Sequence, residues 1–445
     1  MHDELTIHYK PLGGSVGNAV ERACYSDIGL SVGGKWLTTL EDRLASTVSD
    51  HIRGNVHLLA TWFAANWWRL RWEPESRDWA TDVDWRMAHS IASAGGGFVW
   101  PNVLFSSDGD TIAVASRPKL DAASFEPVRY LYRVDAHIPA VEFENKVDNF
   151  LESVITRLRE LKIDDDSLPQ LWAGVMAERR DPRAAQWRKL EAMAGYDPDE
   201  APEGLSGKLH EDQDRLGKGA VEEVAAEARH GLDAALQPMR EASRSRQPRE
   251  GGCRVAVPPL KGKGPDAAAY PWQVASILAN QARDEWGLGA KPIRNKGLAD
   301  LLSTSSNNLF GAFVPRAKTP FAIRNGRNGH LDVYLHSPIP ASRRFALCRL
   351  IGDQLLSNDK ERLVPATHAR TVRQKFQRAF AQEFLCPYPA LRERLQTDKA
   401  TEDDIIEAAQ YFHVSPLLVK TTLVNKGEME RAALPADSGY ARARE

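Results

Sequence analysis

The chain has 445 residues, of which 27% are charged, and its formal net charge is −2. This length allows two or three domains with a substantial core. The small net charge argues against a protein that coats nucleic acid or a membrane surface along its whole length, although it does not report on local patches. The four cysteines, Cys24, Cys253, Cys348 and Cys386, form no CxxC pair, so we expect neither a disulfide framework nor a thiolate zinc site.

The N-terminal residues lack a basic segment followed by an apolar one, which a secretory signal would require. The most apolar stretch, His57 to Trp68, is far shorter than the ~20 residues that span a bilayer. We therefore expect a cytoplasmic protein that does not interact with membranes.

Residues 1–165 are predicted to form an α+β domain, because period-two and helical apolar patterns alternate there. Strands are expected around the turn Gly33-Gly34 and around the hairpin signal Asp108-Gly109. The remaining expected elements are a helix over Ala45–Trp72, a strand over Val128–Val134 and a helix over Phe143–Leu161.

Residues 166–236 are predicted to be an acidic helical segment, with eleven acids and four bases between Tyr196 and Ala235. Residues 237–269 contain Gly251-Gly252 and Pro258-Pro259 and almost no apolar periodicity. We interpret them as a linker or mobile loop.

Residues 270–430 are predicted to form the last domain, followed by a tail, 431–445. The chain as a whole is thus expected to be a mainly helical, multi-domain α+β protein. The expected elements of the last domain are helices over Trp272–Leu288, Ala341–Ser357, Thr371–Leu385 and Glu402–Asn425, and strands over Phe321–Ile323 and Leu331–Leu335.

Two of these helices carry a family resemblance. Arg344 to Leu356 reads RFALCRLIGDQLL and resembles the active helix of ImmA/IrrE metallo-endopeptidases, which reads like RFxLAHELGHxLL. Gln377 to Pro387 reads QRAFAQEFLCP and resembles that family's ANxFAxELLMP. Pro271 to Leu302 and Phe412 to Ser415 resemble its leading helix and its closing helix-turn pattern. The resemblance covers about a third of the chain and implies a zincin-like domain of helices and a small sheet.

The residues that the family's chemistry needs are replaced. An HExxH helix presents two zinc-binding histidines and a glutamate base, but the corresponding residues here are Arg349, Leu350 and Asp353. Arginine offers a metal no lone pair, and leucine cannot act as a base. The acidic third ligand is expected between Arg373 and Gln377, where no acid occurs. We therefore expect no metal, no cofactor and no catalytic residue.

Arg349 and Asp353 lie four residues apart, so they are predicted either to form an ion pair in the remnant of the cleft or to be a solvated surface pair. An alternative is a zinc endopeptidase with non-standard ligands. Its candidate ligands match no standard spacing; they are Asp353, Cys348, Cys386, His330, His336 and His368.

The resemblance also implies a role. Active members of the family are switches that cleave helix-turn-helix repressors in stress, phage or mobile-element responses, so a degenerate member is expected to be a regulatory or interaction module with a protein partner, such as a transcriptional regulator. The strand with Leu331, Val333 and Leu335 is expected to be an edge strand on which an extended partner segment pairs.

A basic patch gives a further alternative, a regulator that binds nucleic acid. Between Val314 and Arg378 the sequence has thirteen Lys or Arg residues and four acids. The competing interpretation is that the patch faces the acidic segment within the same molecule. The candidate residues are Arg316, Lys318, Arg324, Arg327, Arg370, Arg373, Lys375 and Arg378.

Overall fold

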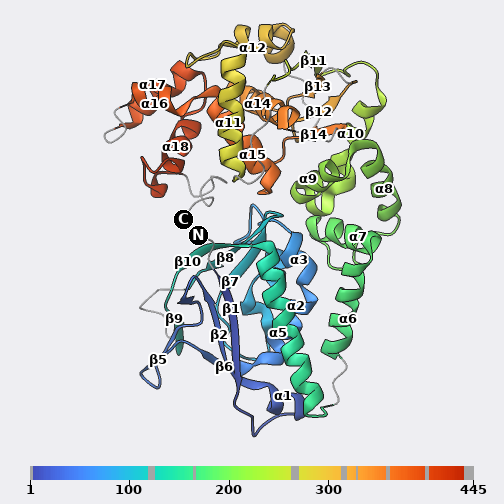
Figure 1. Ribbon diagram of the computed structural model, residues 1–445, viewed down its shortest axis with the longest axis vertical. Coiled ribbons are helices and arrows are strands. Elements are labelled where there is room, and N and C mark those ends of the chain that lie inside the picture. Colours follow the sequence, from blue (N-terminus) through green and yellow to red (C-terminus); the bar gives the residue numbers. More distant parts are fainter. Residues whose placement is uncertain are drawn as a thin grey trace. The chain divides into compact units, whose positions relative to one another are not determined.

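The protein combines helices with several small antiparallel sheets, which confirms the α+β class (Figure 1). This computed structural model describes residues 4–118, 126–163, 167–261, 270–311, 318–326, 329–356, 361–395 and 400–434. Contacts divide the chain into two compact units, Met1–Ala201 and Pro202–Arg444, and each is described by itself.

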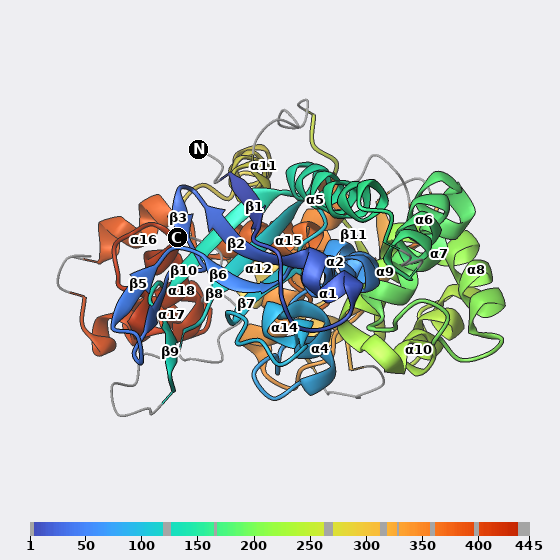
Figure 2. The same ribbon diagram turned by 90° about the horizontal axis from the view of Figure 1, so that it is seen from below.

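The described part of the N-terminal unit contains three antiparallel sheets: β2 with β1, β3 and β6; β10-β8-β7; and β5-β4-β9 (Figure 2). Its strands are β1 (Leu5–Pro11), β2 (Tyr25–Val32), β3 (Lys35–Trp36), β4 (Leu40–Asp42), β5 (Thr47–Ser49), β6 (Ile52–Asn55), β7 (Val103–Ser107), β8 (Thr111–Ser116), β9 (Val128–Tyr130) and β10 (Val134–Pro139). Its helices are α1 (Ala19–Cys24), α2 (Val56–Ala65), α3 (Trp67–Trp72), α4 (Val83–His89), the 3-10 helix η1 (Ile91–Ala94), α5 (Ala140–Glu160), α6 (Ser167–Arg180) and α7 (Pro182–Met193).

Both predicted turns of this unit are present. Gly33 and Gly34 join β2 to β3 with φ of 56° and 77°, a conformation that glycine adopts without steric cost. Asp108 and Gly109 lie between β7 and β8, where the Asp108 carboxylate accepts hydrogen bonds from the Asp110 and Thr111 amides.

The helix predicted over Ala45–Trp72 is only half right. Helix α2 begins at Val56, where Asn55 caps it by accepting a hydrogen bond from the His57 amide. The residues before it form β5 and β6, and β6 pairs with β2. The predicted strand over Val128–Val134 is likewise divided, because β9 and β10 join different sheets.

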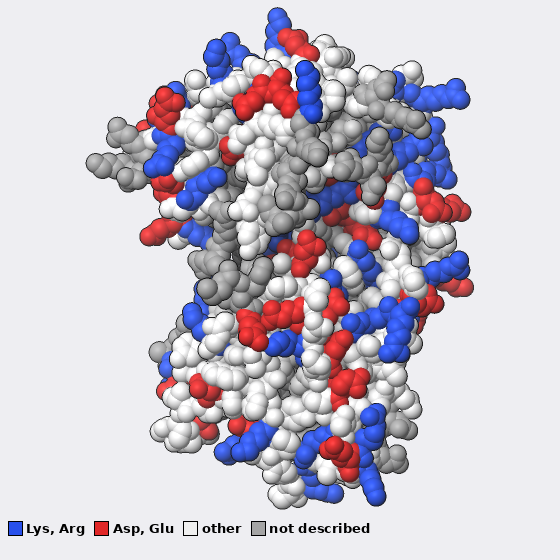
Figure 3. Space-filling model, viewed as in Figure 1, with Lys and Arg blue, Asp and Glu red and all other residues white. Residues whose placement is uncertain are grey.

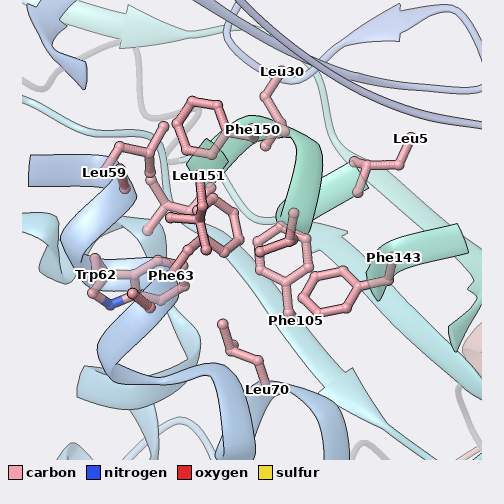
Figure 4. Packing of buried hydrophobic residues seen from close by; sticks show 14 of the residues in the cluster. Leu5, Leu30, Leu59, Trp62, Phe63, Leu70, Phe105, Phe143, Phe150 and Leu151 are labelled. Atoms are coloured by element: carbon pink, nitrogen blue, oxygen red, sulfur yellow. The ribbon is translucent and has the colours of Figure 1, made fainter. Parts of the chain in front are cut away.

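Aromatic rings from α2, β7 and α5 make the centre of this unit's core (Figure 4). The ring centroid of Phe105 lies 5.8 Å from that of Phe63 and 5.7 Å from that of Phe143. Helix α5 closely matches the predicted helix over Phe143–Leu161 and buries its periodic apolar residues from Phe143 to Leu158, whereas Leu161, just beyond the helix, is exposed.

In its described residues, the C-terminal unit is built around a four-stranded sheet of order β11-β13-β12-β14. Its strands are β11 (Gly252–Ala256), β12 (Phe321–Arg324), β13 (His330–Tyr334) and β14 (Leu363–Pro365). Its helices are α8 (Leu205–Leu216), α9 (Lys218–Ala228), the 3-10 helix η2 (Arg229–Gly231), α10 (Leu232–Arg244), α11 (Pro271–Glu285), α12 (Asn295–Leu301), α13 (Ser306–Phe310), α14 (Pro340–Leu356), α15 (Val372–Leu385), α16 (Tyr388–Arg394), α17 (Glu402–Phe412), α18 (Pro416–Asn425) and the 3-10 helix η4 (Arg431–Ala433).

The two faces of this sheet bury different residues. Ala322, Val333 and Val364 share one apolar cluster with residues of α11, α14 and α15. Phe321 and Leu363, which alternate with them, are also fully buried, and α9 contacts β14 while α10 contacts β12. The unit therefore has the sheet between two layers of helices.

This arrangement changes the interpretation of two segments. The predicted linker 237–269 contains the end of α10 and the whole of β11, which pairs with β13, so this part is an ordered piece of the unit. Helices α8 to α10 of the predicted acidic segment belong to the C-terminal unit, whereas α6 and α7 belong to the N-terminal one. Among the described residues, no helix is long and apolar enough to cross a membrane.

Candidate functional site

Helices α14 and α15 bring together the residues at which the resemblance places a metal site. Arg349, Leu350 and Asp353 lie on α14, and all three are buried. Helix α15 begins after Thr371, whose hydroxyl accepts a hydrogen bond from the Gln374 amide. Its first turns direct Arg373, Gln374 and Gln377 towards α14, so side chains from the stretch where a third ligand was expected do meet those of α14.

Asp353 is the centre of this cluster. Arg373 binds its carboxylate through two nitrogens, with Nε 2.6 Å from Oδ2 and Nη2 2.9 Å from Oδ1. Gln377 Nε2 donates to the same Oδ2 at 2.8 Å, and Arg324 Nη2 lies 3.4 Å from Oδ1. Burial opposes the charged form, but these donors outweigh it and hold the pKa of Asp353 below its ordinary value.

Arg349 has different partners. Its guanidinium donates to the backbone carbonyl of Ala366 at 3.3 Å, to that of Thr367 and to the side-chain oxygen of Gln374. The Asp353 carboxylate forms ion pairs with Arg373 and Arg324, and the Arg349–Asp353 ion pair stays a prediction. A four-residue spacing places two side chains on one helical face, but here α15 supplies a guanidinium that meets the carboxylate in a two-point geometry.

The side chains at the positions of the expected ligands do not suit zinc. The two α14 positions carry a guanidinium, which has no lone pair to give, and a carboxylate whose oxygens already accept hydrogen bonds from three side chains. Leu350 is fully buried in the apolar cluster of the unit. Burial also raises the pKa of the Cys348 and Cys386 thiols to about 12, which disfavours the thiolate that a metal would need. In the parts of the chain that the structure describes, no group of three or more His, Cys, Asp or Glu side chains is placed to hold a metal ion.

Helix α9 adds carboxylates that sequence reasoning did not assign to this site. Glu223 is buried, and its Oε2 accepts a hydrogen bond from the Thr371 hydroxyl at 2.7 Å. Glu227 accepts one from the His368 amide at 2.8 Å. Burial raises the pKa of Glu223 above its ordinary value, and the nearby Arg373 charge opposes this only in part.

Glu361, which precedes β14, binds the start of α9. Glu361 accepts hydrogen bonds from the Gly219 amide at 2.6 Å and the Ala220 amide at 3.2 Å, two groups that a helix N-terminus leaves without internal partners. The same carboxylate binds Arg373 Nη1 at 2.7 Å through its other oxygen. The acidic segment thus meets the basic stretch within one unit, as one of the two interpretations of that stretch predicted.

Much of the basic stretch is therefore not a surface patch. The side chains of Arg324 and Arg373 are 8% and 19% exposed and bind carboxylates. Arg378 donates to the carbonyl of Ala369 at 3.1 Å. On the face shown in Figure 3, basic and acidic side chains are interspersed. The other candidates comprise exposed Lys318, the partly buried Arg370 and Lys375, and Arg316 and Arg327, which lie outside the described residues.

The predicted edge strand is an inner strand. Strand β13 pairs with β11 on one side and with β12 on the other, so its backbone is not open to an extended partner. Leu331 and Val333 are buried, and Leu335, just beyond the strand, packs against the same cluster. The prediction of an edge strand was wrong because β11, which pairs with β13, lies in the segment interpreted as a linker.

Comparison of the chain with protein-family models, with curated proteins and with solved structures found no match.

Proposed function

We propose that this chain is a catalytically degenerate relative of the ImmA/IrrE peptidases that acts as a regulatory or protein-interaction module. The observation that supports this most directly is the cluster around Asp353. Arg349, Arg373 and Gln377 occupy, on two facing helices, the region in which the resemblance places zinc ligands. A buried cluster of cations and amides stabilises a carboxylate, but it provides neither a metal-bound water nor a base for hydrolysis.

The contacts of α9 support the same proposal. A peptidase must admit an extended segment of its substrate beside the active helix, and here Glu223 and Glu227 join α9 to residues at the start of α15. Strand β14, the sheet's edge beside this cluster, is buried and is contacted by α9. We infer that the domain serves as a scaffold in a bacterial stress, phage or mobile-element response, with a protein partner such as a transcriptional regulator bound elsewhere on its surface.

The test compares metal content in two forms of the protein. We expect the purified chain to carry no stoichiometric zinc. A variant with Arg349→His, Leu350→Glu, Asp353→His and Gln374→Glu should gain zinc before it gains proteolysis, because ligand geometry is simpler to rebuild than substrate positioning.

Elemental analysis and a peptide-hydrolysis assay give the two readouts. About one zinc per chain in the unaltered protein, lost on Asp353→Asn, would overturn the proposal in favour of a zinc endopeptidase. Failure of the restored variant to bind zinc while it remains folded would show that α14 and α15 do not have the geometry of a metal site.

A further inference from the structure

The segment that follows α10 carries a group of arginines that the site in α14 and α15 does not use. Residues 240–254 read REASRSRQPREGGCR, with five arginines and two glutamates. The first arginine, Arg240, is buried against a carboxylate of α8. The next three, Arg244, Arg246 and Arg249, are exposed. Unlike much of the predicted basic patch, this positive charge therefore lies on the surface of the C-terminal unit.

Hydrogen bonds hold the backbone of this segment in place. Arg254 on β11 donates through Nη2 to the carbonyl of Arg246 at 2.9 Å and through Nη1 to the side-chain oxygen of Gln247 at 3.3 Å. The Arg249 amide donates to the hydroxyl of Tyr334 at 3.1 Å. The exposed guanidiniums are thus attached to an ordered backbone, so a ligand that binds them does not have to order the chain as well.

A residue distant in the sequence adds another positive charge. Arg362 is exposed and donates through Nη2 to the carbonyl of Ser243, in the last turn of α10 and 119 positions away. Cations at a helix C-terminus stabilise the helix dipole, which accounts for Arg362 and for Arg244, the last residue of α10. It does not account for Arg246 and Arg249, which lie beyond the end of the helix.

Carboxylates offset this charge only in part. Glu241 lies 3.4 Å from Nη2 of Arg249, but the two side chains are 41% and 44% exposed, so water screens this pair. Glu250 is also exposed. Asp332 is 2% exposed, and Arg254 binds it through two nitrogens, so this third carboxylate is neutralised within the fold.

Two guanidiniums of the group have no partner in the protein. Among the residues that the structure describes, no hydrogen bond or ion pair engages the guanidinium of Arg244 or Arg246. The surrounding surface is polar, since no large hydrophobic side chain is exposed between Leu171 and Tyr270 in the described part of the chain. Protein interfaces centre on apolar and aromatic anchors, whereas interfaces with nucleic acid are polar and positively charged. These features favour phosphate groups over a protein partner.

We propose that Arg244, Arg246, Arg249 and Arg362 form a surface that binds the phosphate backbone of a nucleic acid. The planar guanidinium can donate two parallel hydrogen bonds to the oxygens of one phosphate. Contacts of this kind position a protein on the backbone but do not read the base sequence. The inference goes beyond the proposed function, which concerns a protein partner and the cluster around Asp353.

Fluorescence anisotropy of a labelled duplex DNA, titrated with the full chain, tests the proposal. Each phosphate that an arginine neutralises contributes about −0.9 to the slope of log affinity against log salt concentration. Four arginines should give a slope of about −3.6, so binding should weaken roughly a hundredfold between about 50 and 200 mM salt. In the variant with Arg244→Ser and Arg246→Ser, the slope should be about half as steep, and the same change in salt should weaken binding only about tenfold.

The matched control removes the same charge elsewhere. Arg159 on α5 and Arg180 on α6 are exposed, and Arg159→Ser combined with Arg180→Ser should leave both the affinity and the salt slope unchanged. Equal losses of affinity in the two double variants would overturn the proposal, because binding would then depend on net charge alone.

Two measurements on the unaltered chain are also decisive and need no variant. Absence of duplex binding at about 50 mM salt, where phosphate contacts are strong, would overturn the proposal. Competition with poly-L-glutamate distinguishes the class of partner. We expect it to displace the labelled DNA much less well than unlabelled duplex at the same concentration of charge. Equal displacement would contradict the proposal and indicate an acidic protein segment as the ligand.

Discussion

The pair of Asp353 and Arg373 allows a double-mutant cycle to test how the buried cluster around Asp353 stabilises the C-terminal unit. The variants are Asp353→Ala, Arg373→Ala and the combination of both. Asp353 is 3% exposed and Arg373 19%, and Nε and Oδ2 are 2.6 Å apart. At an effective dielectric constant of about 20, charge centres roughly 4 Å apart attract each other by about 4 kcal/mol.

The two single changes should differ. Arg373→Ala leaves the buried carboxylate of Asp353 with only Gln377 and the more distant Arg324 as donors, so we expect a loss of about 3–5 kcal/mol. Asp353→Ala leaves Arg373 paired with Glu361, so the expected loss is smaller, about 2–3 kcal/mol. The double variant should lose less than the sum, with a coupling energy of at least about 2 kcal/mol.

Equilibrium urea denaturation of the full chain measures these free energies, and amide hydrogen exchange in α14 and α15 assigns the transition to the C-terminal unit. The matched control is the pair of Lys420 and Glu402 at 2.6 Å, whose carboxylate side chain is 70% exposed; its coupling should stay below about 1 kcal/mol. Because the pKa of Asp353 is lowered, the coupling should be full above about pH 4 and decline as the pH falls. Equal, sub-kilocalorie couplings for both pairs would refute the reasoning.

Two further changes test neighbouring contacts. Glu223 has a raised pKa, so the unaltered protein should lose stability as the pH rises above about 4.5, and Glu223→Gln should remove this loss. Glu211→Gln, at an exposed position of α8, should not remove it, and identical pH profiles of unfolding for both variants would contradict the assignment. Arg349→Met should lower the free energy of unfolding by about 2–4 kcal/mol, because it leaves the carbonyls of Ala366 and Thr367 and the Gln374 side chain without this donor. Arg392→Met, at a 63% exposed position, should lower it by less than about 0.5 kcal/mol. Similar melting curves for the two variants would show that Arg349 is dispensable.

Local sequence patterns predicted the helices around the site well. The apolar period and the prolines before it indicated α14, and Thr371 and Cys386-Pro387 correctly marked the limits of α15. The prediction of a helix over Ala45–Trp72 was wrong at its start, where the chain forms β6. This strand pairs with β2, whose residues lie more than twenty positions away in the sequence. A helical period in Val48 and Ile52 carried no information about that pairing.

The partners of the site residues could not be predicted from the sequence either, because they come from distant parts of the chain. That Arg349 and Asp353 share a face followed from their spacing, but their partners come from α15 and from the carbonyls beside β14. The contribution of α9 was foreseen only as a general attraction between an acidic and a basic segment. The specific contact, Glu223 with Thr371, joins residues that lie 148 positions apart.

The basic stretch illustrates why a count of charges along a sequence is a weak indicator of a binding surface. Arg343 and Arg344 are 6% and 1% exposed, and both donate to backbone carbonyls, Arg343 to those of Ser337 and Gly311 and Arg344 to those of Ile293 and His413. Burial lowers the pKa of both guanidiniums, yet arginine remains charged because its ordinary value is so high.

A buried arginine can donate hydrogen bonds to several backbone carbonyls that would otherwise be buried without a donor, because its planar guanidinium carries five N–H groups. Arg349 follows the same pattern with Ala366 and Thr367. A histidine at position 349 would satisfy at most one of these carbonyls while it bound a metal. Under the proposed function, replacement of a metal ligand by arginine therefore does more than remove a ligand, because the Arg349 guanidinium supplies a cationic charge and joins α14 to Gln374 on α15. On this argument, the variant proposed above with four new metal ligands should bind zinc but, without zinc, be less stable than the unaltered chain, because the Ala366 and Thr367 carbonyls lose their donor.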